Sequence, residues 1–125
     1  NQFELLRALV AHNPERSYMI ARSMMKHSRS SPLILVIATL YGTFFKALIY
    51  QGMGAHPNPK TASAELGVSE FALRDIAKAA QNYSGGHLAR IVGYLREADR
   101  QAKGMASPNL RDSDILDELL FKILY

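Results

Sequence analysis

The ionisable side chains of this sequence offer few combinations that could carry out chemistry. The histidines are scattered, and none lies at metal-ligand spacing from another histidine or an acid; they are His12, His27, His56 and His87. The chain has no cysteine, which removes thiolate ligands, a thiol nucleophile and disulfides. No serine, histidine and aspartate share the local context of a catalytic nucleophile. We therefore predict a non-catalytic domain with no metal site and no bound cofactor.

Asp99 is an acid in an unusual place. It falls in register with Leu88, Val92 and Leu95, on the stripe of a predicted helix that should face the core. A buried carboxylate without a partner is costly, so we expect an ion pair with Lys103, one turn onward. A general acid or base would need a second catalytic group nearby, and the sequence offers none. We therefore predict that Asp99 and Lys103 have a structural role.

A short pattern in the middle of the chain has the look of a helix-turn-helix, in which a second helix enters the major groove. It consists of Thr61–Ser69 (TASAELGVS) followed by a predicted helix. Arg74 and Lys78 would be its nucleic-acid contacts. However, Glu70 and Asp75 lie among the few outward positions and would meet phosphates unfavourably. We therefore favour a packing motif and keep nucleic-acid binding through Arg74 and Lys78 as the rival.

The most apolar segment, Leu33–Tyr50, is eighteen residues long with Lys46 as its one charge, which is enough to span a membrane. On a helix, polar residues would form a stripe along one edge; they are Thr39, Thr43, Lys46 and Tyr50. A lipid-facing helix does not need such a stripe, whereas a central bundle helix does where one edge meets water or a partner. We therefore predict a helix of a soluble bundle, with no membrane contact.

The whole sequence is predicted to form helices separated by residues that cap or break helices. An asparagine or serine cap followed by proline begins two of them, at Asn13-Pro14 and Ser31-Pro32, and serine caps are predicted at Ser69 and Ser84. Loops are predicted at 52–59 and 104–109, and short breaks at 12–13, 28–31 and 67–69. No segment alternates over strand length. The fold class is therefore all-α, a bundle of about seven helices from one domain of 125 residues.

Charge is unevenly distributed along the chain. Between residues 16 and 64 there are six basic residues and no acid, whereas residues 97–125 hold six acids and four bases. Such a molecule could meet complementary neighbours in an assembly, although a generic solvated surface explains the pattern equally well. The sequence also begins with Asn1 inside a predicted helix, so we expect a fragment of a longer protein.

Several segments carry recognisable sequence patterns, and their order and spacing along the chain are informative. They are Phe3–Leu9, Ser31–Lys46, Ala64–Phe71, Ala80–Ser84, Leu95–Gly104 and Leu116–Leu120. The Asn82-Tyr83-Ser84 junction and the Asp99-x-x-x-Lys103-Gly104 element are the most specific. In this order and spacing, the segments resemble the C-terminal helical collar domain of bacterial DNA polymerase III delta subunits, over essentially the whole chain.

This resemblance implies a single collar domain over residues 1–125, preceded in the full protein by two AAA+-type domains absent from this sequence. The implied function is to oligomerise with gamma/tau and delta-prime subunits as a scaffold of the cytoplasmic clamp loader in DNA replication. The sliding clamp would be contacted only through the absent N-terminal domain, and DNA only indirectly. The delta subunit is not an ATPase. Solvent-facing parts of Leu33–Tyr50 and Ser84–Lys103 are the expected contact surfaces.

Overall fold

The computed structural model describes residues 1–27, 32–105 and 109–125. Within these ranges the chain forms seven α-helices and no strand, so the all-α prediction is confirmed. The helices are α1 (Gln2–Val10), α2 (Pro14–Lys26), α3 (Leu33–Gln51), α4 (Pro59–Leu66), α5 (Glu70–Asn82), α6 (Gly85–Ala102) and α7 (Asp112–Leu124).

The helices begin where local capping chemistry allows. The side chains of Asn13, Ser69 and Ser84 each accept a backbone N–H of the first turn of α2, α5 and α6, as predicted. α4 begins at Pro59, the last residue of the predicted loop 52–59, because Asn58 caps it. The predicted cap at Ser31 lies outside the described residues.

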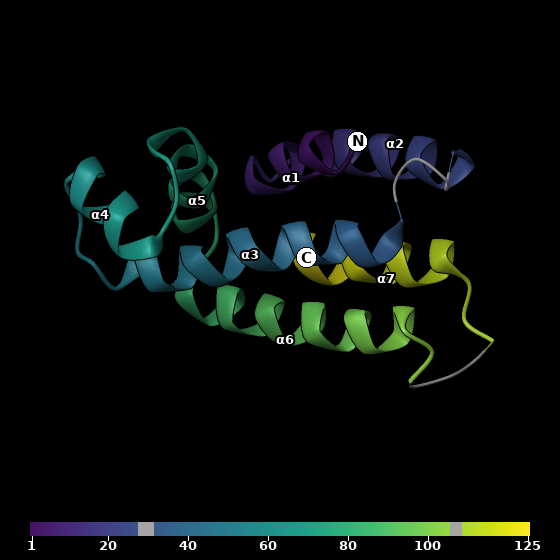
Figure 1. Cartoon of the computed structure of the whole chain (residues 1–125). Coiled ribbons are helices and arrows are strands. Elements are labelled where there is room, and N and C mark those ends of the chain that lie inside the picture. The colour runs from purple at the N-terminus through teal and green to yellow at the C-terminus, as the bar shows by residue number, and fades with distance from the viewer. Residues whose placement is uncertain (28–31, 106–108) are drawn as a thin grey trace.

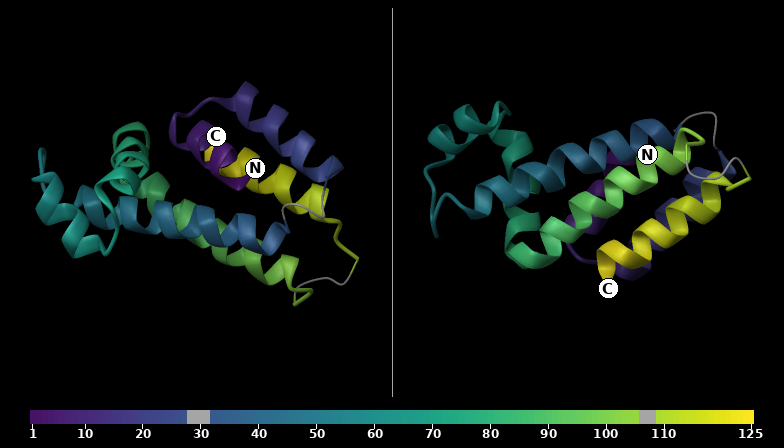
Figure 2. Two further views of the ribbon diagram at one scale, coloured as in Figure 1. Left: turned by 45° about the horizontal axis from the view of Figure 1, so that its top comes forward. Right: turned by 90° about the horizontal axis from the view of Figure 1, so that it is seen from below.

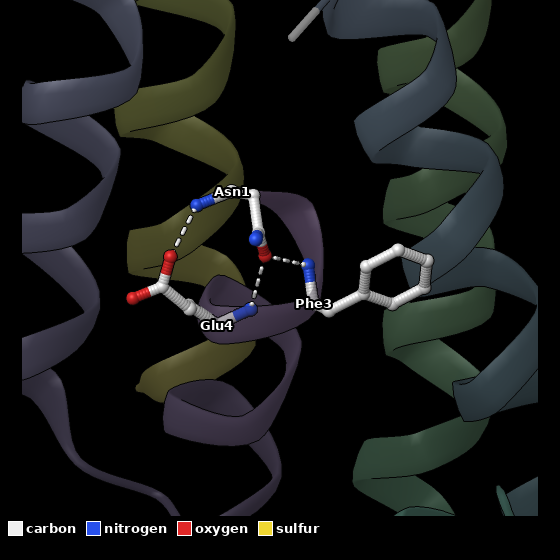
Figure 3. A network of polar contacts seen from close by, with 3 residues as sticks. All are labelled: Asn1, Phe3 and Glu4. Atoms are coloured by element: carbon white, nitrogen blue, oxygen red, sulfur yellow. Dashed lines mark hydrogen bonds and ion pairs between the residues drawn. The ribbon is translucent and has the colours of Figure 1, made fainter.

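α1 begins with a capping box (Figure 3). The Asn1 side-chain oxygen accepts the backbone N–H groups of Phe3 and Glu4 at 3.0 Å, and the Glu4 carboxylate accepts from the Asn1 backbone nitrogen at 2.7 Å. Phe3 points away from this network and is 52% exposed. The box fixes the start of the helix that covers part of the core.

Five helices form an elongated bundle, with α4 and α5 at one end (Figure 1). α3, α6 and α7 lie side by side, and α1 and α2 cover them from the other side (Figure 2). α3 and α6 are antiparallel neighbours, since Gln51 at the end of α3 lies beside Gly85 at the start of α6, and Tyr41 of α3 contacts Arg96 of α6. One apolar core runs between all these helices.

Tyr83 links the helices at the end of the bundle where α5 meets α6. Its ring is buried, its hydroxyl donates to the Leu9 carbonyl of α1, and Asn82 donates from its side chain to the Val10 carbonyl at 2.7 Å. The Gln51 amide of α3 donates to the carbonyls of Ala80 and Tyr83, at 2.9 and 2.7 Å. Backbone carbonyls at the ends of α1 and α5 are thereby bonded by side chains from other parts of the chain.

Two histidines extend this arrangement to α7. The rings of His12 and His87 each lie 5.3 Å from the Tyr83 ring in edge-to-face geometry. Their Nε2 atoms lie 2.8 and 3.3 Å from the Leu124 and Lys122 carbonyls near the end of α7, which requires that each Nε2 carries the proton. His12 is exposed to solvent and at the same time bonds to α7. Its left-handed backbone, with φ of 54°, lets the ring reach across to α7.

Removal of the Tyr83 hydroxyl tests how much this network stabilises the fold. We expect Tyr83→Phe to lower the free energy of unfolding at neutral pH by about 1 kcal/mol, because a buried hydrogen bond is lost while the ring is retained. Equilibrium urea unfolding measures the difference, and Tyr125→Phe, at an exposed tyrosine, serves as the matched control. Equal stabilities of Tyr83→Phe and the native chain would contradict the assignment.

The same variant has an expected pH dependence. Burial raises the pKa of Tyr83 well above its ordinary value near 10. Above about pH 10 the unfolded chain releases this proton and the folded chain keeps it, so stability should fall by up to about 1.4 kcal/mol per pH unit. Unfolding measured from pH 7 to 11 should show a shallower alkaline decline in Tyr83→Phe. Parallel curves for the two proteins would count against this source of the decline.

Candidate protein interface on α3 and α6

The exposed surface of α3 is apolar along most of its length. Ile34, Phe45 and Ile49 are 43%, 37% and 44% exposed, and Leu35 is 54% exposed. Ile34, Ala38, Phe45 and Ile49 are spaced so that they share one face of the helix. A contiguous apolar surface of this kind is typical of an interaction site. The sequence pattern did not single out these residues, because a helix that is apolar around most of its circumference does not reveal which side is covered.

The polar stripe of α3, predicted to meet water or a partner, is partly covered by the rest of the chain. Its residues are all half-buried; they are Thr39, Thr43, Lys46 and Tyr50. The Thr39 hydroxyl donates to the Leu35 carbonyl of its own helix at 3.0 Å, which satisfies it without water. The stripe is therefore partly accessible, and the lysine stem can be covered while its ammonium stays hydrated.

α6 continues this surface with small residues and one arginine. The Arg96 guanidinium lies 6.0 Å from the Tyr41 ring centre and donates to the Tyr41 hydroxyl at 3.3 and 3.4 Å. Tyr41 in turn stacks on Phe45, with ring centres 5.6 Å apart. Ala89 and Gly93 are exposed on the same side of α6 as Arg96, by their helical spacing.

We call this surface the α3–α6 face. Its members are Ile34, Ala38, Tyr41, Phe45 and Ile49 of α3 and Ala89, Gly93 and Arg96 of α6. Figures 1 and 2 show these two helices running side by side over most of the length of the bundle. Stacked arginine, tyrosine and phenylalanine side chains are characteristic of the residues that dominate binding energy in protein interfaces.

Two glycines inside these helices have no role in internal packing. A Cβ placed on Gly42 or on Gly93 would meet no atom within 4 Å. Glycine inside a helix costs roughly 0.5–1 kcal/mol relative to alanine, so the fold alone would favour alanine at both positions. Their absence of a side chain leaves room for another backbone to approach the α3–α6 face closely.

Asp99 and Lys103 form the expected pair, with 2.7 Å between Lys103 Nζ and Asp99 Oδ2. The predicted burial was wrong, because the Asp99 side chain is 35% exposed. Asp99 lies near the end of α6 and lines a shallow pocket between α6 and α3, through which its carboxylate reaches solvent. Periodicity placed it on the core stripe correctly, but α3 does not close over this part of α6.

Arg74 and Lys78 line a groove between α1 and α5 rather than projecting from a free recognition helix. The groove is open, has a volume of about 560 Å³, and also includes Arg7 and Phe71. Phe71 is 66% exposed, with the Arg74 guanidinium 5.6 Å from its ring centre. The inner face of α5 is formed by Leu73, Ile76 and Ala79. Arg7 was missed because its helix is distant in sequence.

Within residues 1–27, 32–105 and 109–125, no three or more His, Asp or Glu side chains lie close enough to share a metal ion. α3 is long and apolar enough to cross a membrane, with a mean hydropathy of 1.9, and a third of that window is buried. Helices α1, α5 and α6 all pack against it, which is the arrangement of a bundle helix.

The same architecture occurs in a protein of known structure. No protein-family model matches the sequence, and a search of curated proteins gave no match. Among solved structures, the DNA clamp loader delta protein of Bacillus subtilis matches with a TM-score of 0.78 and 21% identity. The match covers 98% of this chain and 35% of that protein, so the chain spans about a third of its length. The fold implied by the sequence resemblance is therefore confirmed.

Neutralising the exposed pair should matter little. We expect Asp99→Asn to change the free energy of unfolding by less than about 0.5 kcal/mol, because an exposed i, i+4 pair is weak and a carboxylate near a helix C-terminus is disfavoured by the helix dipole. Thermal unfolding at low and high salt measures the change, with Glu97→Gln, which removes the neighbouring pair with Arg100, as the control. A loss above 2 kcal/mol would instead indicate a tightly held, desolvated pair.

Proposed function

We propose that this chain is the assembly domain of a clamp-loader delta subunit and binds neighbouring subunits through the α3–α6 face. The observation that carries the proposal is this exposed apolar face, on a fold shared with the Bacillus subtilis clamp loader delta protein. The aromatic and arginine side chains at its centre would supply most of the binding energy. The open glycines, Gly42 and Gly93, would let a partner helix pack closely.

In this role the domain works by position rather than by chemistry. The network around Tyr83 fixes α1, α3, α5 and α7 relative to one another, so a subunit bound on the α3–α6 face is held at a defined angle to the rest of the chain. The partners would be gamma/tau and delta-prime subunits of the cytoplasmic clamp loader. The sliding clamp would be reached through a domain outside this sequence, and the delta subunit would hydrolyse no ATP.

Introducing positive charge into the apolar face tests the proposal. We expect the double variant Phe45→Arg/Ile49→Arg to bind gamma/tau and delta-prime at least about 100-fold more weakly, because two arginines would be desolvated in an apolar interface. Isothermal titration against the purified subunits of the same bacterium measures affinity. Met19→Arg, at an exposed apolar position on α2 outside the face, is the control.

The outcomes separate the proposal from its competitors. Circular dichroism must show that the double variant is as helical and as heat-stable as the control. Unchanged affinity in the folded double variant would refute the use of this face. Flotation of the chain with lipid vesicles, lost in the double variant and without subunit binding, would instead identify α3 as a membrane-binding element.

The groove between α1 and α5 supports a second candidate function, binding of a nucleic-acid single strand. Arg7, Arg74 and Lys78 place three cations along the groove against one acid, Asp75. Phosphates could pair with the cations while a base stacks on exposed Phe71. A groove bounded by two helices does not present one helix to a major groove, so a single strand fits better than a duplex.

Matched charge reversals test this second function. We expect Arg74→Glu/Lys78→Glu to abolish binding of a labelled 20-nucleotide single strand in fluorescence anisotropy at low salt, because phosphate pairing is replaced by repulsion. Lys26→Glu/Lys60→Glu makes the same change in net charge at exposed sites outside the groove and should retain most of the affinity. Equal losses in both variants would mean that only net charge matters, and the groove would not be a site.

A further inference from the structure

A pocket opens on the α3–α6 face beside the Arg96–Tyr41 stack. Its walls come from both helices, and its lining residues are Ile37, Ala38, Tyr41, Leu95, Arg96 and Asp99. Its volume is about 240 Å³. The floor is apolar, since it is formed by the buried core residues Ile37 and Leu95. Such a pocket has room for one aliphatic side chain but not for a helix.

The charged residues at the pocket mouth indicate which kind of partner residue should lie next to that aliphatic side chain. Asp99 already has a cationic partner in Lys103, with 2.7 Å between Oδ2 and Nζ. Arg96 forms no ion pair with any residue in the described ranges, and its planar guanidinium is held over the Tyr41 ring. α3, which forms the other wall, contains no acidic residue. A carboxylate from outside would complete the bonding of Arg96, since a fork of N–H donors matches it bidentately.

We infer that this pocket receives a single Leu or Met anchor from a helix of the neighbouring subunit, and that an Asp or Glu within one turn of the anchor pairs with Arg96. This inference rests on the proposed use of the α3–α6 face and specifies the partner surface. A helix is the expected element because Gly42 and Gly93 leave the face open to close backbone approach. Within one helical turn, an anchor and an acid at i and i+3 or i+4 project to the same side.

Plugging the pocket provides the first arm of the test. Ala38 lies at the exposed pocket mouth, so Ala38→Phe should fill the pocket without disturbing the core. We expect Ala38→Phe to weaken binding of gamma/tau or delta-prime at least 10-fold in isothermal titration. Arg96→Gln, which removes the charge, should weaken it by a similar factor. Met19→Phe, outside the face, should bind as the native chain does, and circular dichroism checks the fold of each variant.

Cross-linking identifies the occupant directly. Because the chain has no cysteine, Ala38→Cys introduces a unique thiol that can carry a photoreactive benzophenone. Mass spectrometry of the irradiated complex should place the cross-link on a Leu or Met of a partner helix, three or four residues from an Asp or Glu. The same label on Met19→Cys should give no cross-link to a partner.

The arms distinguish this inference from the function on which it rests. Strong weakening by Phe45→Arg/Ile49→Arg together with native affinity in Ala38→Phe would overturn the anchor pocket and leave the assembly function standing. A cross-link to a polar loop, or to a helix with no acid within one turn, would also overturn it. Failure of the native chain to bind either subunit would refute the assembly function itself.

Discussion

The fold depends on satisfying backbone carbonyls where three helices end in one place. α1, α5 and α7 all finish near Tyr83, and each leaves carbonyls that its own helix cannot bond. Side chains from other parts of the chain supply the donors: Tyr83 and Asn82 for α1, Gln51 for α5, and His12 and His87 for α7. Because each donor belongs to a different element from its acceptor, these bonds fix the relative positions of the helices as well as their ends.

This arrangement leaves exposed side chains on the α3–α6 face that the fold does not require. The bundle is closed through its core and through the bonds around Tyr83, so exposed apolar side chains such as Ile34 and Ile49 are not needed to close it. Evolution toward stability alone would place polar residues at Ile34 or Phe45 and alanine at Gly42 and Gly93. The exposed apolar side chains and the open glycines are costs to the isolated domain, and they become favourable only when a second surface covers them.

The sequence predicted the fold better than it predicted the site. Asparagine and serine caps, the glycine at 67 and the helical spacing of apolar residues are local signals, and they located the helices within a few residues. The exposures of Phe71, Phe45 and Asp99 depend on which helix lies next to which, and local spacing carries no such information. Arg7 joins Arg74 and Lys78 only because α1 and α5 pack together. His12 bonds to α7 across 112 residues of sequence, for the same reason.

The composition of α3 follows from burial on two sides at different stages. Leu33, Val36, Ile37, Leu40, Phe44 and Ala47 are covered when the chain folds. Ile34, Ala38, Phe45 and Ile49 remain open then, and in the proposed assembly a neighbouring subunit would cover them. Summed over both stages, most of the circumference of the helix is apolar, which is also what a membrane requires. Two observations fit the two-stage burial better than a lipid environment. Other helices pack around α3. Lys46 and the threonines of α3 also place hydroxyl and ammonium groups along one edge, which a lipid-facing helix does not need.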